Sequence, residues 1–107
     1  MLGDVTIVAI SGELDVALCV KVAPDINAVL RSPVRAVVID LDAVSLVDSS
    51  GVALLLNTFR RLDQAGRQLA IACPMGPQRR AFELTALDRQ LPIYETRDEA
   101  LAAVGAG

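Results

Sequence analysis

The 107-residue sequence contains no histidine, and aromatic residues make up only 3% of it. The absence of histidine excludes the Ser-His-Asp and Cys-His arrangements of nucleophilic catalysis, together with every metal site that needs an imidazole. Because aromatic residues are scarce, the core must be built from Val, Leu, Ile and Ala. With 53% hydrophobic residues, the chain is expected to form one folded domain over residues 1–107. No catalytic residues, no cofactor and no enzymatic activity are expected.

Cysteine is also rare, and the two residues present, Cys19 and Cys73, both lie among apolar neighbours. Two isolated thiols cannot form a structural zinc site with four ligands. A free buried cysteine behaves as a small hydrophobic residue, which is the interpretation favoured for both. A redox disulfide stays open, because the sequence does not give their distance in space. The other metal-ligand candidates are carboxylates around predicted strand ends, interpreted as solvated loop charges: Glu13, Asp15, Asp40, Asp42 and Asp48.

The sequence has neither an excess of positive charge nor a long apolar run. Its formal net charge is -3, from 10 basic and 13 acidic residues, which gives no electrostatic reason to expect nucleic-acid binding. The pairs Arg60-Arg61 and Arg79-Arg80 are interpreted as solvated helix faces. No apolar run reaches the length of a membrane span, and the N-terminus lacks the pattern of a signal peptide. A cytoplasmic protein that binds neither nucleic acid nor membrane is expected.

Apolar periodicity and the positions of glycine and proline predict alternating strands and helices. The predicted strands are residues 5–10, 13–14, 34–41, 68–73 and 91–96, with Ser11-Gly12 separating the first two and a loop over residues 42–48. The predicted helices lie within residues 16–30, from Val52 to an end at Gly66, over residues 77–87, and over residues 98–104 with Arg97 or Asp98 near the cap. This order predicts a largely parallel sheet covered by helices.

Pro24 falls inside the first helical segment. Proline removes a backbone donor and clashes with the preceding turn. Two interpretations follow: the helix begins at Pro24 as its first residue, after an irregular turn, or one helix is kinked there.

The segment Asp48-Ser49-Ser50-Gly51 lies between a buried strand and an amphipathic helix, at the edge of the sheet where ligand and partner sites gather. Asp48 and Ser49 are both good N-cap residues, so the motif is interpretable as a helix cap alone. A cap needs one polar side chain, however, and two serines leave a hydroxyl beyond what the cap uses. Gly51 permits close approach by another backbone and has no side chain to shield Ser50.

Phosphorylation of Ser50 is physically coherent in this position. A phosphate adds about -1.5 to -2 charges and three acceptor oxygens. Free N–H groups and the helix dipole favour an anion at a helix N-terminus, so the fold is expected to tolerate it. The same charge is expected to disrupt a partner that buries the neutral serine. The motif is neither Gly-x-Ser-x-Gly nor a P-loop, which removes the other interpretations considered.

Four segments resemble motifs of STAS domains, in the right order: Gly12-Glu13-Leu14-Asp15; Val37-Val38-Ile39-Asp40-Leu41 followed by Val47-Asp48-Ser49-Ser50-Gly51; residues 79–87 with Ile93-Tyr94; and Glu99-Ala100-Leu101. They resemble the turn after the first strand, the central strand with its phosphorylation loop, the third helix and last strand of the anti-anti-sigma branch, and the closing helix. The match covers essentially the whole chain. It implies an α/β fold, a single STAS domain with a mixed, mostly parallel β-sheet of four to five strands and about four α-helices packed mainly on one face.

The resemblance also implies a function, that of a bacterial anti-anti-sigma factor, also called an anti-sigma factor antagonist. Such a protein, when unphosphorylated, binds an anti-sigma factor that is also a histidine-kinase-like serine kinase, and thereby releases a sigma factor. Phosphorylation at the serine before the glycine, here Ser50, switches it off, and a metal-dependent serine phosphatase restores it. Asp48 and Ser49 are implied to shape the docking loop, and Gly51 and Asp15 are expected in the same surface.

Other STAS-like domains supply an alternative, a scaffold or ligand-binding module without a phosphoswitch. Two departures from the family pattern concern helix geometry alone. One is Pro24, and the other is Ala86, which stands where a glycine often follows Leu-Thr.

A strip on the helix after Ser50 gives a separate hypothesis about the docking surface. Leu54 lies off the apolar stripe of this helix, and Asn57 and Arg61 follow it at i+3 and i+7. Two interpretations stand side by side, a contact surface for the partner and a single exposed leucine of the ordinary kind.

Overall fold

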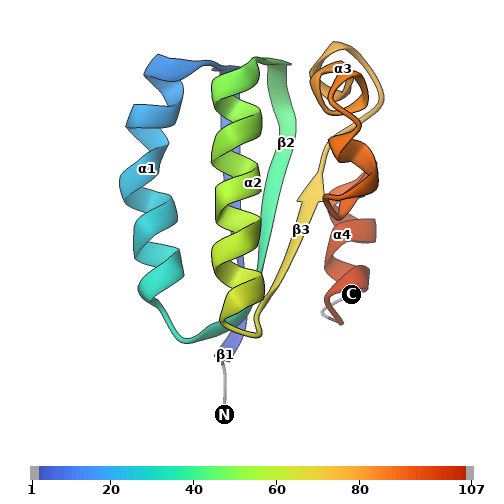
Figure 1. Ribbon diagram of the computed structural model, residues 1–107. Coiled ribbons are helices and arrows are strands. Elements are labelled where there is room, and N and C mark those ends of the chain that lie inside the picture. The colour runs from blue at the N-terminus through green and yellow to red at the C-terminus, as the bar shows by residue number, and fades with distance from the viewer. Residues whose placement is uncertain (1–2, 106–107) are drawn as a thin grey trace.

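A computed structural model describes residues 3–105, and within them a four-stranded sheet is flanked by helices (Figure 1). The elements in chain order are β1 (Gly3–Leu14), α1 (Val16–Arg31), β2 (Val34–Val47), α2 (Ser49–Gln64), β3 (Gln68–Ala72), α3 (Pro77–Leu84), a 3₁₀ turn (Leu87–Arg89), β4 (Ile93–Tyr94) and α4 (Arg97–Ala103). The strands lie in the order β1-β2-β3-β4, and each neighbouring pair is parallel. The α/β class and the strand–helix alternation predicted from the sequence are confirmed.

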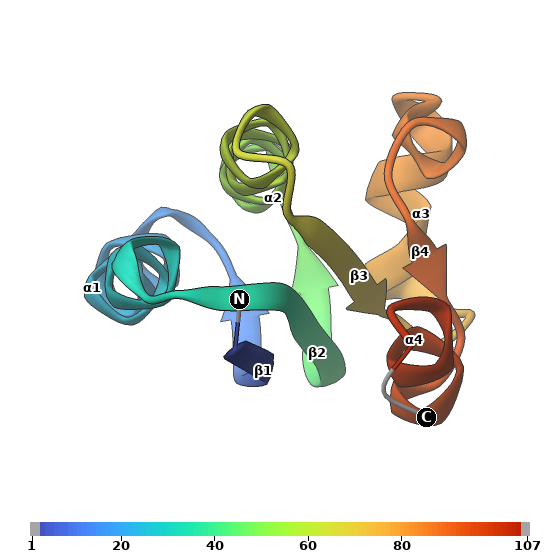
Figure 2. The same ribbon diagram turned by 90° about the horizontal axis from the view of Figure 1, so that it is seen from below.

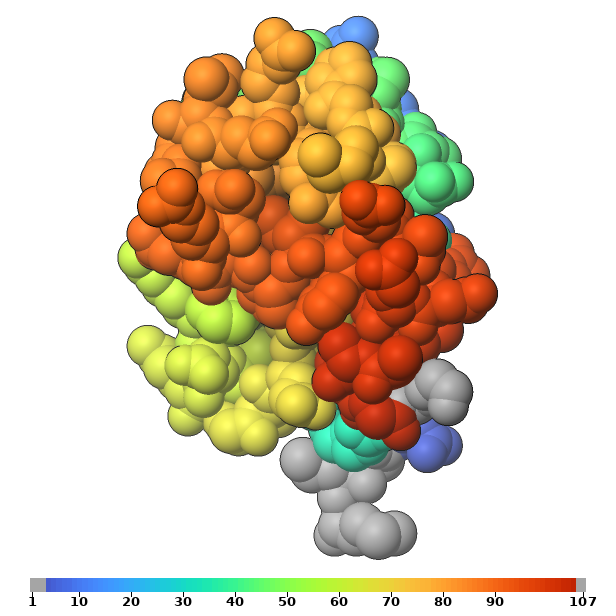
Figure 3. Space-filling model, turned by 90° about the vertical axis from the view of Figure 1, so that its right-hand side faces the viewer, coloured from blue at the N-terminus to red at the C-terminus, as the bar shows by residue number. Residues whose placement is uncertain are grey.

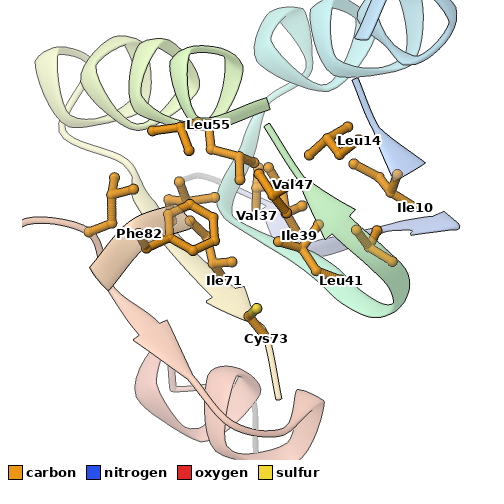
Figure 4. Packing of buried hydrophobic residues seen from close by; sticks show 14 of the residues in the cluster. Ile10, Leu14, Val37, Ile39, Leu41, Val47, Leu55, Ile71, Cys73 and Phe82 are labelled. Atoms are coloured by element: carbon orange, nitrogen blue, oxygen red, sulfur yellow. The ribbon is translucent and has the colours of Figure 1, made fainter. Parts of the chain in front are cut away.

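The helices divide unequally between the two faces of the sheet (Figure 2). On one face, β2 residues such as Val37 and Ile39 pack with Leu55 of α2 and Phe82 of α3 in the main core, and residues of α1 pack against its side (Figure 4). On the other face, α4 covers a smaller cluster built largely from alanine: Ala36, Val38, Ala70, Ala72, Ala100 and Val104. Small side chains on this second face let α4 approach the sheet closely. Figure 3 shows the outer side that α3 and α4 present. The expected packing mainly on one face is therefore confirmed.

The first strand is longer than the sequence indicated. The predicted break at Ser11-Gly12 and the separate short strand at residues 13–14 are wrong, because β1 continues from Gly3 to Leu14. The pairing with β2 instead shifts register between Ala9 and Ser11, and again between Gly12 and Glu13. Gly12 has a φ of 102°, which a glycine adopts without strain. The glycine therefore marks an irregularity within a strand and not its end.

The predicted loop over residues 42–48 is also wrong, because β2 extends to Val47. Val44 and Val47 are buried in the main core, while Asp42 before them and Ser45 between them are exposed. β3 stops at Ala72, opposite Asp40, so the last part of β2 pairs with β1 alone. The two strands together form a ribbon that leads directly to the Asp-Ser-Ser-Gly segment.

Pro24 lies within one continuous helix, so the interpretation in which the helix begins there is wrong. Pro24 is exposed, and α1 tolerates the loss of one backbone donor because it continues for about two turns on either side of the proline. The last strand and helix are slightly displaced from their predicted bounds, and the cap of α4 is Thr96 rather than Arg97 or Asp98. Both cysteines are free thiols, with Cys73 buried and Cys19 partly buried.

Candidate functional site

The helices α1 and α2 begin side by side at the edge where β1 and β2 end (Figure 1). In parallel α/β sheets this carboxyl edge is where binding sites form, because helix N-termini and loops meet there. Each helix begins at an aspartate N-cap, Asp15 for α1 and Asp48 for α2. The structure thus brings together two predicted site segments that are far apart in the sequence.

Asp48 is a fully engaged cap. Its Oδ1 accepts the N–H of Ser50 at 2.9 Å and the N–H of Gly51 at 3.1 Å. Its carbonyl accepts the N–H of Val52 at 3.0 Å, the first hydrogen bond of the helical ladder. A carboxylate in this place satisfies two first-turn donors and interacts favourably with the helix dipole.

Gly51 is buried because the end of β1 lies directly against it. A Cβ added at Gly51 would stand 2.7 Å from the carbonyl oxygen of Leu14 and 2.9 Å from a methyl carbon of Val47. The N–H of Asp48 also donates to the carbonyl of Leu14, at 3.2 Å. The close backbone approach expected at Gly51 is therefore real, and the neighbour is the chain's own first strand.

The two serines differ in exposure. Ser49 is exposed, and Ser50 is partly exposed in the first turn of α2. Ser50 is thus partly accessible to solvent, while its backbone N–H donates to Asp48.

Asp15 mirrors Asp48 at the start of α1. One of its carboxylate oxygens accepts the N–H of Leu18 at 2.9 Å. The thiol of Cys19 lies near both caps: its pKa is raised by burial first, and then by the negative charges of Asp48 and Asp15. Cys19 is therefore a neutral thiol between the two helix starts, which argues against its being a reactive thiolate.

The remaining predicted residues extend away from Ser50 along α2. Leu54 is only partly exposed, because it packs against the main core. Asn57 is exposed, and Arg61 donates to Asn27 of α1 at 3.4 Å. Asn57 and Arg61 are thus solvent-facing, whereas Leu54 is half-buried, and a partner contact at this strip stays a prediction.

One carboxylate has a different role from the one expected. Asp40 is buried, its Oδ2 accepts the Nε of Arg97 at 2.7 Å, and its Oδ1 accepts the N–H of Asp42 at 2.9 Å. It ties the start of α4 to β2, so the interpretation of Asp40 as a solvated loop charge is wrong. Between residues 3 and 105, no group of three or more Cys, Asp or Glu residues is placed to hold a metal ion.

Sequence reasoning missed several apolar side chains that surround the site. Leu46, just before the motif, is 48% exposed, and Val16 and Val20 on the first turns of α1 are 61% and 70% exposed. The apolar residues of α1 were predicted to form a helix, but their burial was not predicted one by one. Whether a valine of α1 is buried or exposed depends on which face of the helix packs on the sheet, and that face is known only from the packed structure.

Similarity to known proteins identifies the family of this chain. The STAS domain family matches residues 2–100, so the chain belongs to the STAS domain family. It is 30% identical, over 91% of its length and 84% of the relative's, to an anti-sigma F factor antagonist of Paenibacillus polymyxa. The crystal structure of an anti-sigma factor antagonist from Mycobacterium paratuberculosis superposes with a TM-score of 0.88 at 33% identity, covering 98% of this chain and 92% of that one. The unphosphorylated form of the anti-sigma factor antagonist SpoIIAA superposes with a TM-score of 0.77 at 25% identity, covering 100% and 94%.

No helix among the described residues is both long enough and apolar enough to cross a bilayer.

Proposed function

We propose that this protein is a cytoplasmic anti-sigma factor antagonist, a binding protein without enzymatic activity, that is switched off by phosphorylation at Ser50. In its unphosphorylated state it binds an anti-sigma factor with a histidine-kinase-like serine kinase domain, and this binding releases a sigma factor. The bound kinase phosphorylates Ser50, and a metal-dependent serine phosphatase removes the phosphate. The observation that carries the proposal is the partly exposed Ser50 in the first turn of α2, where its N–H donates to the Asp48 carboxylate.

The docking surface follows from what is exposed around that serine. It comprises the motif itself, the cap of α1, the apolar side chains beside them and the exposed polar face of α2: Asp48, Ser49, Ser50, Gly51, Asp15, Leu46, Leu54 and Asn57. Gly51 contributes by its backbone, since it is buried against Leu14. Apolar contacts of Leu46 supply the buried area, and the caps supply polar specificity.

A phosphate acts on this surface and not on the core. It adds about -1.5 to -2 charges to a position flanked by the carboxylates of Asp48 and Asp15. A partner that had buried the neutral serine would have to desolvate that charge. The free energy of desolvating the charge exceeds what the contacts around the serine contribute to binding. Phosphorylation therefore raises the dissociation rate of the complex while the domain stays folded.

The test is phosphorylation and binding with Ser50 and Ser49 variants. Incubation with the cognate kinase and ATP is expected to add one phosphate, mapped by mass spectrometry to Ser50. Ser50→Ala is expected to bind the partner and to resist inactivation by the kinase. Ser50→Glu is expected to bind at least about tenfold more weakly, a loss of about 1.4 kcal/mol of binding free energy.

Ser49→Ala is the matched control, because it removes the neighbouring hydroxyl and leaves Ser50 in place. It is expected to be phosphorylated on Ser50, and its binding is expected to fall on phosphorylation as that of the wild type does. Phosphate mapped to Ser49, or normal binding by the fully phosphorylated protein, would refute the proposal. Thermal stabilisation by a nucleotide or lipid, with no kinase partner captured, would instead support the scaffold or ligand-binding alternative.

A further inference from the structure

Two first-turn amides of α2 already donate hydrogen bonds to an anion, the carboxylate of Asp48. The Oδ1 atom of Asp48 accepts the N–H groups of both Ser50 and Gly51, at 2.9 and 3.1 Å. These are the two donors that a phosphate on the Ser50 side chain would reach most directly. The N–H groups of Ser50 and Gly51 are therefore already occupied in the unphosphorylated protein, and the expected tolerance of a phosphate at this helix start stays a prediction.

The cap is held in place from behind. The N–H of Asp48 donates to the carbonyl of Leu14, and Gly51 lies so close to the same carbonyl that no Cβ fits between them. The backbone that carries the carboxylate is thus fixed on the end of β1. Moving the carboxylate aside would break two charge-assisted hydrogen bonds and leave the Asp48 carboxylate without these donors.

The surrounding charges also disfavour an inward phosphate. The carboxylates of Asp48 and Asp15 both act on the space between α1 and α2, where the Cys19 thiol lies. Of the cations on adjoining elements, Arg79 of α3 donates Nε and Nη2 to the carbonyl of Cys73, at 3.2 and 2.6 Å. Glu13 on β1 and Lys21 on α1 line the same hollow as Asp15, whereas Asp42 on β2 lies beside Asp40 and the start of α4.

We propose that Asp48 is a positioning residue of the switch, which holds the Ser50 and Gly51 amides, denies them to a phosphate on Ser50, and so directs that phosphate outward into the docking surface. The inference rests on the proposed phosphorylation of Ser50 and explains why the modification acts on the partner. A phosphate folded back onto the helix start would be partly neutralised by N–H groups and the dipole. A phosphate kept off the amides presents its full charge to whatever docks there.

Two substitutions that both remove the Asp48 carboxylate are expected to behave oppositely, because only one of them also removes the cap. In Asp48→Ala the two amides are free, so the phosphate turns inward and becomes the cap of α2. In Asp48→Asn a neutral side chain of the same shape still caps the helix, because asparagine is as good an N-cap as aspartate. The alanine variant is therefore expected to lose the outward orientation of the phosphate, and the asparagine variant to keep it.

The experiment uses the full chain with phosphoserine incorporated at position 50 during synthesis, so no kinase is needed. Amide ¹H and ¹⁵N resonances of Ser50 and Gly51 are followed while the phosphate titrates through its second pKa of about 6. In the wild type and in Asp48→Asn these amides are expected to shift little with the phosphate. In Asp48→Ala they are expected to follow its titration. Phosphorylation is also expected to raise the melting temperature of Asp48→Ala by about 4 °C, and not that of the wild type.

Asp42→Ala is the matched control, since it removes an exposed carboxylate from the same edge without removing a cap. It is expected to behave as the wild type. Ser50 and Gly51 amides that track the phosphate in the wild-type protein itself would overturn the inference, even if Asp48→Ala failed to fold. An Asp42→Ala variant that reproduced the Asp48→Ala response would overturn it as well, because general charge would then explain the effect. Neither readout involves a partner, so this result stands or falls separately from the proposed binding cycle.

Discussion

Three residues from two distant segments of the chain set the geometry of the candidate site. Leu14 ends β1, and its carbonyl accepts the N–H of Asp48 while its backbone lies against Gly51. Asp48 in turn holds the first-turn amides of α2. The position of the Ser50 hydroxyl therefore depends on a contact between β1 and α2, and not on the motif alone.

Gly51→Ala is expected to destabilise the protein by about 1–3 kcal/mol, because its Cβ would meet backbone that cannot move aside cheaply. The start of α2 has to shift away from Leu14, which displaces Ser50. Urea unfolding measures the stability change, and the amide resonances of Leu14 and Ser50 report the shift.

Gly66→Ala is the comparison for this prediction. Gly66 has a φ of 70° and no atom within 4 Å of an added Cβ, so alanine there costs strain alone, about 1–2 kcal/mol. It lies at the other end of α2 and is expected to leave the Ser50 amide unshifted. A Gly51→Ala variant as stable as the wild type, with an unmoved Ser50 amide, would show that the close approach has no consequence.

At the scale of elements, most differences between the predicted and the observed structure lie at the ends of helices and strands. β2 continues past β3 because it pairs with β1 up to Val47, and Val44 and Val47, three residues apart, are both buried in the core. α3 ends at Leu84, and Ala86 after it has a φ of 59°, in the left-handed region. Glycine is the residue that this conformation favours, which gives a physical meaning to the departure from the family pattern at this position.

Ala86→Gly is expected to stabilise the protein by up to about 1 kcal/mol. Relief of the left-handed strain gains about 1–2 kcal/mol, and the greater freedom of glycine in the unfolded chain takes back about 0.5–1 kcal/mol. Thermal unfolding followed by circular dichroism measures the difference. The exposed Ala65, whose φ is -89°, supplies the control, since Ala65→Gly should not stabilise. A lower melting temperature for Ala86→Gly would contradict the strain argument.

At the scale of the whole molecule, the sheet separates two unequal packing layers. The main core on the α1, α2 and α3 side holds the large side chains, and the α4 side is lined with alanine. The site lies at one end of the main layer, so α4 influences it only through the sheet and through the Arg97–Asp40 ion pair.

Ala70→Leu is expected to destabilise the protein by about 1–3 kcal/mol, because Ala70 is fully buried beneath α4 and has no space for three more carbon atoms. Chemical denaturation measures the loss. Ala65→Leu, at an exposed position, is the control and should change stability by no more than about 0.5 kcal/mol. Equal stability of the two variants would mean that α4 is not tightly packed on the sheet.

Much of this protein was readable from its sequence, because the relevant signals are local. Apolar periodicity gave the order of strands and helices, and Asp48 before α2 was recognisable as a cap from residue type and position. The family, and with it the serine of interest, followed from short motifs in a fixed order.

The tertiary structure decided what depends on residues distant in the chain. The length of β2 follows from its pairing with β1, the role of Gly51 from its contact with Leu14, and the burial of Asp40 from its ion pair with Arg97. Whether the amides beside Ser50 are free or occupied is likewise a matter of atoms within about 3 Å of one another. Residue types limit such contacts, but only the packing of one element against another determines which of them form.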